Sequence, residues 1–169
     1  MSTENQLPAA LAEMSRDEVE AYLEKVGGVL GESDEVIAAA VAGFAGGTAR
    51  LLEFLTAGMA LAFCPERAEG QTGLVEIHIV APEGEIPVWL EVDLDECRTS
   101  ATGSDPDTTV TVPLAVFVRI AFKRLSGADA YMDGLVQAAG DVVLATTLDD
   151  WFDPPDLAAA AAFERFEAP

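Results

Sequence analysis

One histidine, one tyrosine and one aspartate are the side chains of this sequence best placed for acid–base chemistry. His78 is the only histidine, and it stands two residues after Glu76 in a segment of alternating apolar and polar residues. Tyr131 and Asp133 flank the methionine of a short Ala-Tyr-Met-Asp-Gly turn. An imidazole, a phenol or a carboxylate can each transfer a proton to or from a bound substrate. If the protein is an enzyme, Tyr131, Asp133 and His78 would carry the chemistry.

Each of these three residues also has a structural explanation. His78 falls on the polar face of its predicted strand, Tyr131 can pack against the interior, and Asp133 can remain in water. No serine or cysteine in a strained turn accompanies His78, so the pattern argues against a Ser-His-Asp hydrolase. The first interpretation of the sequence is therefore a protein with no catalytic residue.

Acidic clusters and paired glycines could bind a cation or a phosphate, but their spacing argues against both. The carboxylates at 93–96, 105–107 and 149–153 lack the spacing of a calcium loop. The glycine pairs at 27–28 and 46–47 follow helical patterns and lack a Lys-Ser/Thr partner, unlike a phosphate-binding loop. We therefore expect no metal ion and no cofactor.

The composition predicts one acidic domain with few charged partners. Half of the 169 residues are hydrophobic, and 9 basic against 30 acidic side chains give a net charge of −21. Such a surface repels nucleic acid and anionic lipid headgroups, so we expect no nucleic-acid partner. The apolar runs are too short for stable membrane insertion, and the first residues carry no signal-peptide pattern. Cys64 and Cys97 stand far apart, which favours reduced thiols and a cytoplasmic protein.

Two helix-start signals occur near the beginning of the chain. Ser15 and Glu18 form a capping box, and Ser33 precedes two acidic residues in the first turn of a second helix. Paired glycines end both apolar patterns. Residues 1–47 are thus predicted to be an N-terminal helical extension, through which two copies of the chain could form a homodimer.

A change of period in the middle of the chain predicts an α+β fold. Apolar residues follow helical spacing over 49–63, and Pro65 ends this pattern. An alternating pattern with Trp89 on its outward face comes next. Four strands are expected, at residues 74–80, 86–94, 97–101 and 108–112. They would form a meander with one buried face.

Helical spacing returns after the fourth strand. An apolar helix is expected at 113–125, and a single helical turn at 128–132 follows it. A fifth strand at 135–138 and a helix at 142–152, capped by Asp141, complete the pattern. The remaining residues form an Ala-rich tail that ends the chain.

Three motifs make this chain resemble a known family of lipid-binding domains. They are Phe-Cys-Pro-Glu-Arg-Ala at 63–68, the Ala-Tyr-Met-Asp-Gly turn at 130–134 and the Gly-Asp pair at 140–141. In this register they resemble the sterol carrier protein type 2 domain, the non-specific lipid-transfer family. That family usually has Phe-x-Pro-Glu-Lys/Arg-Ala and Ala-Phe-Met-x-Gly with a following Gly-Asp. This chain departs from the family at Lys123, where glycine is frequent, and at 135–138, where the family strand is rich in lysine.

The resemblance implies a fold and a division of the chain. The fold is α+β: a five-stranded, mostly antiparallel sheet covered on one face by helices, with an apolar tunnel between them. The N-terminal extension at 1–47 precedes a sterol-carrier-like lipid-binding domain at 48–153, and 154–169 is a C-terminal helical tail or lid. Oily positions on the predicted helices would line the tunnel. The expected ligand-binding residues are Leu55, Met59, Phe63, Phe117, Ala121, Met132, Leu144, Leu148, Trp151 and Phe152.

Two functions are expected on this basis, and a third possibility is an interaction module in which the acidic surface and the N-terminal helices bind a basic protein. The first is a carrier that binds a hydrophobic small molecule, such as a sterol, a fatty-acyl or a polyketide-like compound, in the tunnel. The missing lysines at 135–138 argue against a ligand with a charged headgroup. The second is a cyclase or isomerase of bacterial secondary metabolism, built on the same fold and acting on a hydrophobic substrate.

Overall fold

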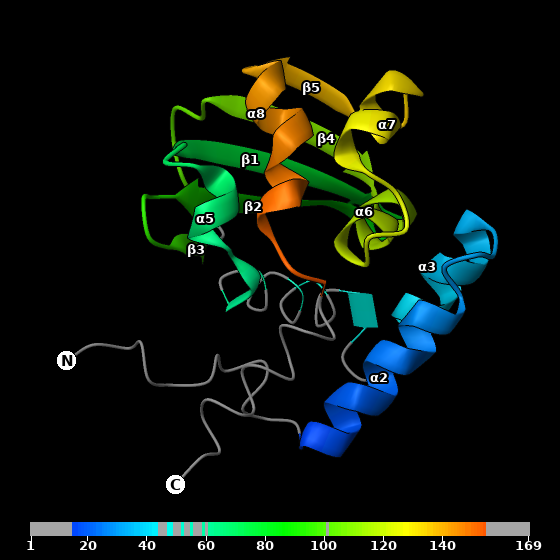
Figure 1. Ribbon diagram of the computed structural model, residues 1–169. Helices are drawn as coiled ribbons and strands as arrows, with labels where there is room; N and C mark the ends of the chain where they lie inside the picture. The colour runs from blue at the N-terminus through cyan, green and yellow to red at the C-terminus, as the bar shows by residue number, and fades with distance from the viewer. Residues whose placement is uncertain are drawn as a thin grey trace, which may run out of the picture.

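The computed structural model contains one five-stranded sheet with helices over one of its faces (Figure 1). It describes residues 15–43, 47–48, 52, 55, 59, 61–100 and 102–154. The predicted tail, apart from Pro154, and much of the helix predicted at 49–63 lie outside the described residues. The strands are β1 (Gly73–Ala81), β2 (Gly84–Val92), β3 (Cys97–Ser100), β4 (Thr108–Pro113) and β5 (Gln137–Gly140).

The strand order is β3-β2-β1-β4-β5, which confirms a five-stranded, mostly antiparallel sheet. β1 pairs with β2, β2 with β3 and β4 with β5 in antiparallel register, whereas β1 and β4 run parallel. The predicted meander is therefore wrong, because β4 lies between β1 and β5 instead of beside β3. A central position gives β4 hydrogen-bonding partners on both edges, which an outer strand lacks.

Asp107 fixes the point where three strands meet. Its carboxylate accepts a hydrogen bond from the Leu74 amide (2.8 Å), and its own amide donates to the Leu74 carbonyl (2.8 Å). The Asp107 carbonyl accepts from the Asp141 amide at 2.9 Å. Gly140 has φ +89°, and a Cβ there would lie 2.5 Å from the Asp107 oxygen, so only glycine fits. These contacts set the register of β1, β4 and β5 together.

The two faces of the sheet differ as the alternation predicts, with one exception. Val75, Ile77 and Ile79 are buried on the inner face, whereas Glu76 lies on the outer face. Trp89 was predicted to lie on the outward face. It does lie on the outer face, paired with Glu76, but it is only 7% exposed. A Cβ at Gly103 would lie 2.5 Å from the Trp89 ring, so the 102–107 loop covers the indole.

Short helices cover the inner face of the sheet, as Figure 1 shows. Pro65 does not simply end a helix, because it occupies the first turn of a short new one, where its missing amide needs no partner. The predicted helix at 142–152 divides into an α-helix and a 3₁₀ turn, and the fifth strand begins two residues later than predicted. The elements are α5 (Pro65–Ala68), α6 (Leu114–Ala121), α7 (Gly127–Met132), α8 (Val142–Thr147) and η2 (Leu148–Trp151).

The predicted N-terminal helices are present as α2 (Arg16–Gly28) and α3 (Asp34–Ala42). The Ser15 capping box and the Ser33 cap both form, with the Ser15 hydroxyl accepting from the Glu18 amide at 3.2 Å. Apolar side chains of both helices are buried in the same core as the sheet. The extension is thus packed onto the domain.

Arg119 on α6 ties the α2–α3 connection to the domain. Its guanidinium donates to the carbonyls of Leu30 (3.2 Å) and Glu32 (2.8 Å) and pairs with the Asp34 carboxylate at 2.7 Å. The Arg119 side chain is 22% exposed, so these bonds are partly shielded from water. None of the helices among the described residues is long and apolar enough to cross a bilayer.

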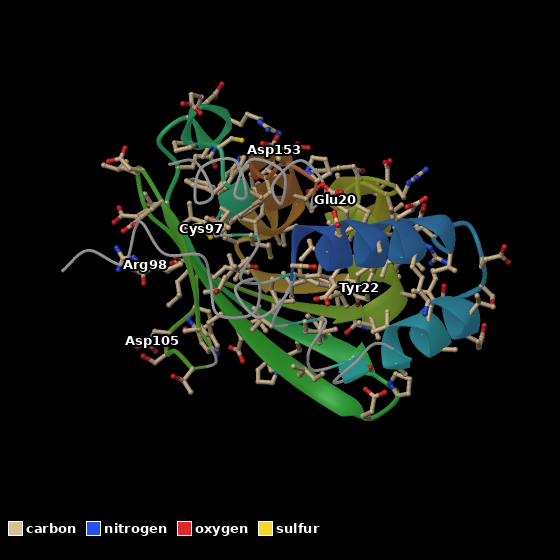
Figure 2. All side chains as sticks on the ribbon, turned by 90° about the horizontal axis from the view of Figure 1, so that it is seen from below. Glu20, Tyr22, Cys97, Arg98, Asp105 and Asp153 are labelled. Atoms are coloured by element: carbon tan, nitrogen blue, oxygen red, sulfur yellow. The ribbon has the colours of Figure 1, made fainter. Side chains whose placement is uncertain are left out.

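We predict that Arg119→Ala lowers the free energy of unfolding by about 2 kcal/mol, because several charge-assisted hydrogen bonds are lost together. Arg98→Ala is the matched control. Arg98 on β3 also makes ion pairs, but its side chain is 57% exposed. Figure 2 shows that Arg98 lies far from α2, the helix that carries the labelled residues Glu20 and Tyr22. Loss of Arg98 should lower stability much less than the loss of Arg119, because water screens exposed ion pairs. Urea unfolding checks both values, and equal effects would contradict the role given to Arg119.

Candidate ligand-binding cavity

A cavity of about 90 Å³ lies between the inner face of the sheet and the helices that cover it. Its walls come from β1, β4, α6, α7, α8 and η2, together with single residues before α5, before β5 and after η2. All but two of its described lining residues are apolar. They are Met59, Ile77, Val110, Val112, Phe117, Ile120, Gly127, Val136, Ala145, Leu148, Asp149 and Phe152.

Four of the ten residues expected to bind ligand meet at this cavity. Met59, Phe117, Leu148 and Phe152 line it together. The sheet residues of the lining, such as Ile77, were not among the ten, although the alternation places them on the inner face. Asp149 was also missed, and no pattern in the sequence marks it as a wall residue.

The other six expected residues lie outside the lining that the structure describes. Leu55, Leu144 and Trp151 are buried at 4%, 4% and 2% exposure and belong to the surrounding core. Ala121 is half-buried at the end of α6. Met132 is at the surface with 79% of its side chain exposed, since α7 directs it away from the core.

The sixth residue, Phe63, packs on Phe152 at one end of the cavity. Their ring centroids are 5.7 Å apart, and the two residues form a β-bridge. The bridge is reinforced on both sides. The Cys64 amide donates to the Trp151 carbonyl (2.7 Å), and the Asp153 amide donates to the Ala62 carbonyl (2.9 Å). Phe152, a wall residue, is thus held by backbone bonds to the segment before α5.

The Arg67 side chain also holds this junction together, and we refer to its contacts as the clamp. It forms an ion pair with Asp153 and donates to the carbonyls of Asp150 (3.3 Å) and Phe152 (3.5 Å). Figure 2 shows Asp153 beside α5, which carries Arg67. The Cys64 thiol lies between these groups, and its pKa is raised, first by burial and then by the Asp153 charge. The thiol therefore stays protonated and is a poor nucleophile.

The residues suited to acid–base chemistry do not meet at the cavity. His78 lies on the outer face, where its ring nitrogens contact Glu76 (2.5 Å) and Glu85 (3.1 Å). Tyr131 is half-buried on α7, and Asp133 is exposed at its end. His78 is therefore separated from the cavity by the sheet, and the geometry does not support the cyclase or isomerase hypothesis.

Asp149 is the polar side chain in the wall. Its carboxylate accepts a hydrogen bond from the Gly127 amide at 3.1 Å, and the Lys123 ammonium donates to its backbone carbonyl. Burial raises the pKa of Asp149, the Gly127 bond opposes this, and the Asp150 charge adds to it. The chemistry available in the cavity is thus apolar contact with one carboxylate at the edge.

The structure is thus an α+β domain in which an apolar cavity lies between a mixed sheet and the helices that cover it. A family model, the SCP-2 sterol transfer family, matches residues 61–153, more than half of the chain. The chain belongs to this family. Lipid binding and transfer is the activity of the family, and α2 and α3 lie outside the match. Comparison with curated proteins gives no significant match.

Several solved structures resemble part of this chain. Palmitated SCP2L2 from Aedes aegypti is 26% identical over 48% of this chain and 72% of its own, with a TM-score of 0.41. Apo sterol carrier protein 2 from Yarrowia lipolytica is 11% identical, covering 71% and 91%, with a TM-score of 0.45. The sec-alkylsulfatase Pisa1 from Pseudomonas is 16% identical over 58% of this chain and only 16% of its own, with a TM-score of 0.51. The Pisa1 likeness shows the fold alone.

We predict that Arg67→Gln loosens the junction around Phe152 without unfolding the sheet. Loss of the clamp should speed amide exchange at 62–64 and 150–153 by about tenfold, which corresponds to roughly 1.4 kcal/mol of lost hydrogen bonding. Hydrogen–deuterium exchange with mass spectrometry measures this, and peptides from β1 and β2 should exchange as in the wild type. Arg98→Gln is the matched surface control. Unchanged exchange at the junction would show that the clamp does not hold it.

Proposed function

We propose that this chain carries a hydrophobic small molecule, such as a sterol, a fatty-acyl or a polyketide-like compound, in the cavity beneath the sheet. The single observation behind the proposal is the composition of the wall. Ten of its twelve described residues have apolar side chains, contributed by three strands or strand ends and by the helices opposite. Membership of the SCP-2 sterol transfer family supports the same conclusion.

The size of the cavity constrains how a ligand enters. Engineered apolar cavities of about 150 Å³ hold benzene, and pockets for larger ligands usually measure about 300–1,000 Å³. The cavity here measures about 90 Å³. A lipid therefore needs its walls to separate. Met59 has a flexible thioether side chain, and Phe152 lies just after η2, where the junction with Phe63 would have to open. We therefore expect the wall to move at these two residues.

Affinity in such a site comes mainly from burial of hydrocarbon. Each Å² of apolar ligand surface removed from water contributes about 25 cal/mol to the free energy of binding, and this contribution depends little on the shape of the ligand. We therefore expect broad selectivity toward the apolar part of the ligand. The unpaired thiols Cys64 and Cys97 are consistent with the proposed cytoplasmic location. A homodimer through the N-terminal helices stays a prediction, which sedimentation equilibrium would test.

We predict that Ala145→Phe weakens binding of a neutral fluorescent lipid probe by about tenfold or more. Ala145 lines the cavity, and a phenyl ring there would occupy the space that the ligand needs. Ala139→Phe is the matched control, because Ala139 is exposed and pairs with Thr109 on the outer face. Thermal unfolding of Ala145→Phe distinguishes a filled cavity from a damaged fold. Filling the cavity keeps or raises the melting temperature, whereas damage to the fold lowers it.

Native mass spectrometry of the purified chain tests the proposal directly. A co-purified apolar compound, released on unfolding and reduced by Ala145→Phe but not by Ala139→Phe, is the expected result. Equal occupancy in both variants would place the ligand elsewhere. The absence of binding to any apolar probe would exclude the carrier function.

A further inference from the structure

The apolar wall of the cavity contains one acidic residue, Asp149, among the residues that the structure describes. Among the lining residues that the structure describes, Asp149 carries the only polar side chain. Asp149 lies on η2 directly after Leu148, and Phe152 follows η2. Leu148 and Phe152 are also in the wall. A ligand that fills the apolar space therefore meets this carboxylate as its only side-chain hydrogen-bonding partner in the described wall.

The local structure makes room for the Asp149 carboxylate. A Cβ at Gly127 would lie 2.6 Å from its Oδ1 atom, so the glycine allows the carboxylate to approach the start of α7. Oδ2 accepts a hydrogen bond from the Gly127 amide. A carboxylate has about four acceptor positions, and this amide uses one of them. The group is thus fixed in place while it keeps the capacity to accept a bond from a ligand.

The charges around Asp149 do not prepare the cavity for an anion. The Lys123 ammonium donates a hydrogen bond to the Asp149 carbonyl. Lys123 itself is exposed and is not among the described lining residues. Burial raises the pKa of Asp149 and the neighbouring Asp150 charge adds to this, while the Gly127 bond and the Lys123 charge oppose it. A second carboxylate in the same apolar space would have to be protonated or stay outside.

We propose that Asp149 selects the polar end of the ligand: the cavity accepts an apolar molecule that ends in a hydrogen-bond donor, a hydroxyl or an amine, and excludes a free carboxylate. This inference rests on the proposed carrier function. A hydroxyl donates to the carboxylate in a charge-assisted bond, which is roughly twice as strong as a neutral one. A fatty acid of the same length has the same hydrocarbon but meets a like charge.

The test compares three ligands that share one chain: dodecanol, dodecylamine and dodecanoate. Each displaces a neutral fluorescent lipid probe from the full chain at neutral pH. Dodecanol and dodecylamine should bind at least about tenfold more tightly than dodecanoate. In Asp149→Asn the advantage over dodecanoate should fall to within about twofold, because the amide can donate to a carboxylate as well as accept from Gly127. Asp150→Asn should keep the wild-type preference.

A second variant guards against an effect of Asp149→Asn on folding. Gly127→Ala forces the carboxylate out of its position and should also reduce the preference for the donor ligands, while circular dichroism reports an intact fold. Equal affinity of the wild type for dodecanol and dodecanoate would overturn the inference and leave the carrier function standing. A preference that survives in both variants would also overturn it. Failure of the probe and all three ligands to bind would exclude the carrier function itself.

Discussion

The parallel pairing of β1 with β4 is the constraint that gives this domain an interior. Two parallel neighbours cannot be joined by a tight turn, so a longer connection must return the chain to the same end of the sheet. Here it does so through β2, β3 and the loop that ends at Asp107, whose hydrogen bonds to Leu74 hold the starts of both strands level. β4 then runs directly into α6, which crosses back over the inner face. The apolar faces of sheet and helix are thereby brought opposite each other.

The same constraint explains where the cavity closes. α6 covers the inner face from one side, and α8 with η2 returns over it after β5 has paired with β4. The last described segment then meets the segment before α5 at the Phe63–Phe152 bridge, and Arg67 fastens the junction. Residues nearly ninety positions apart in the sequence therefore form one end of the wall, which makes this end sensitive to changes at Arg67.

Local signals in the sequence predicted the elements well, and non-local contacts account for what they missed. The hydroxyls of Ser15 and Ser33 cap their helices as expected, because capping depends on residues three positions apart. Alternation identified β1 and β2 but could not reveal that β4 pairs with β1, nor that a distant loop covers Trp89. Helical spacing gave Phe117 and Leu148 as wall residues. Asp149 could not be found, since only the approach of Gly127 from another helix brings its carboxylate to the wall.

The small volume of the cavity follows from the energetics of an apolar carrier without its ligand. An empty apolar cavity destabilises a fold by about 24 cal/mol per Å³, so 90 Å³ costs about 2 kcal/mol. A cavity of roughly 400 Å³, sized for a whole lipid, would cost about 10 kcal/mol, as much as the entire stability of a typical domain. A wall that leaves little empty volume is therefore the more stable arrangement of this chain. In the proposed carrier, a ligand would replace contacts such as those of Phe152 and Met59 with its own, and we expect the junction at Arg67 to determine how readily the walls separate.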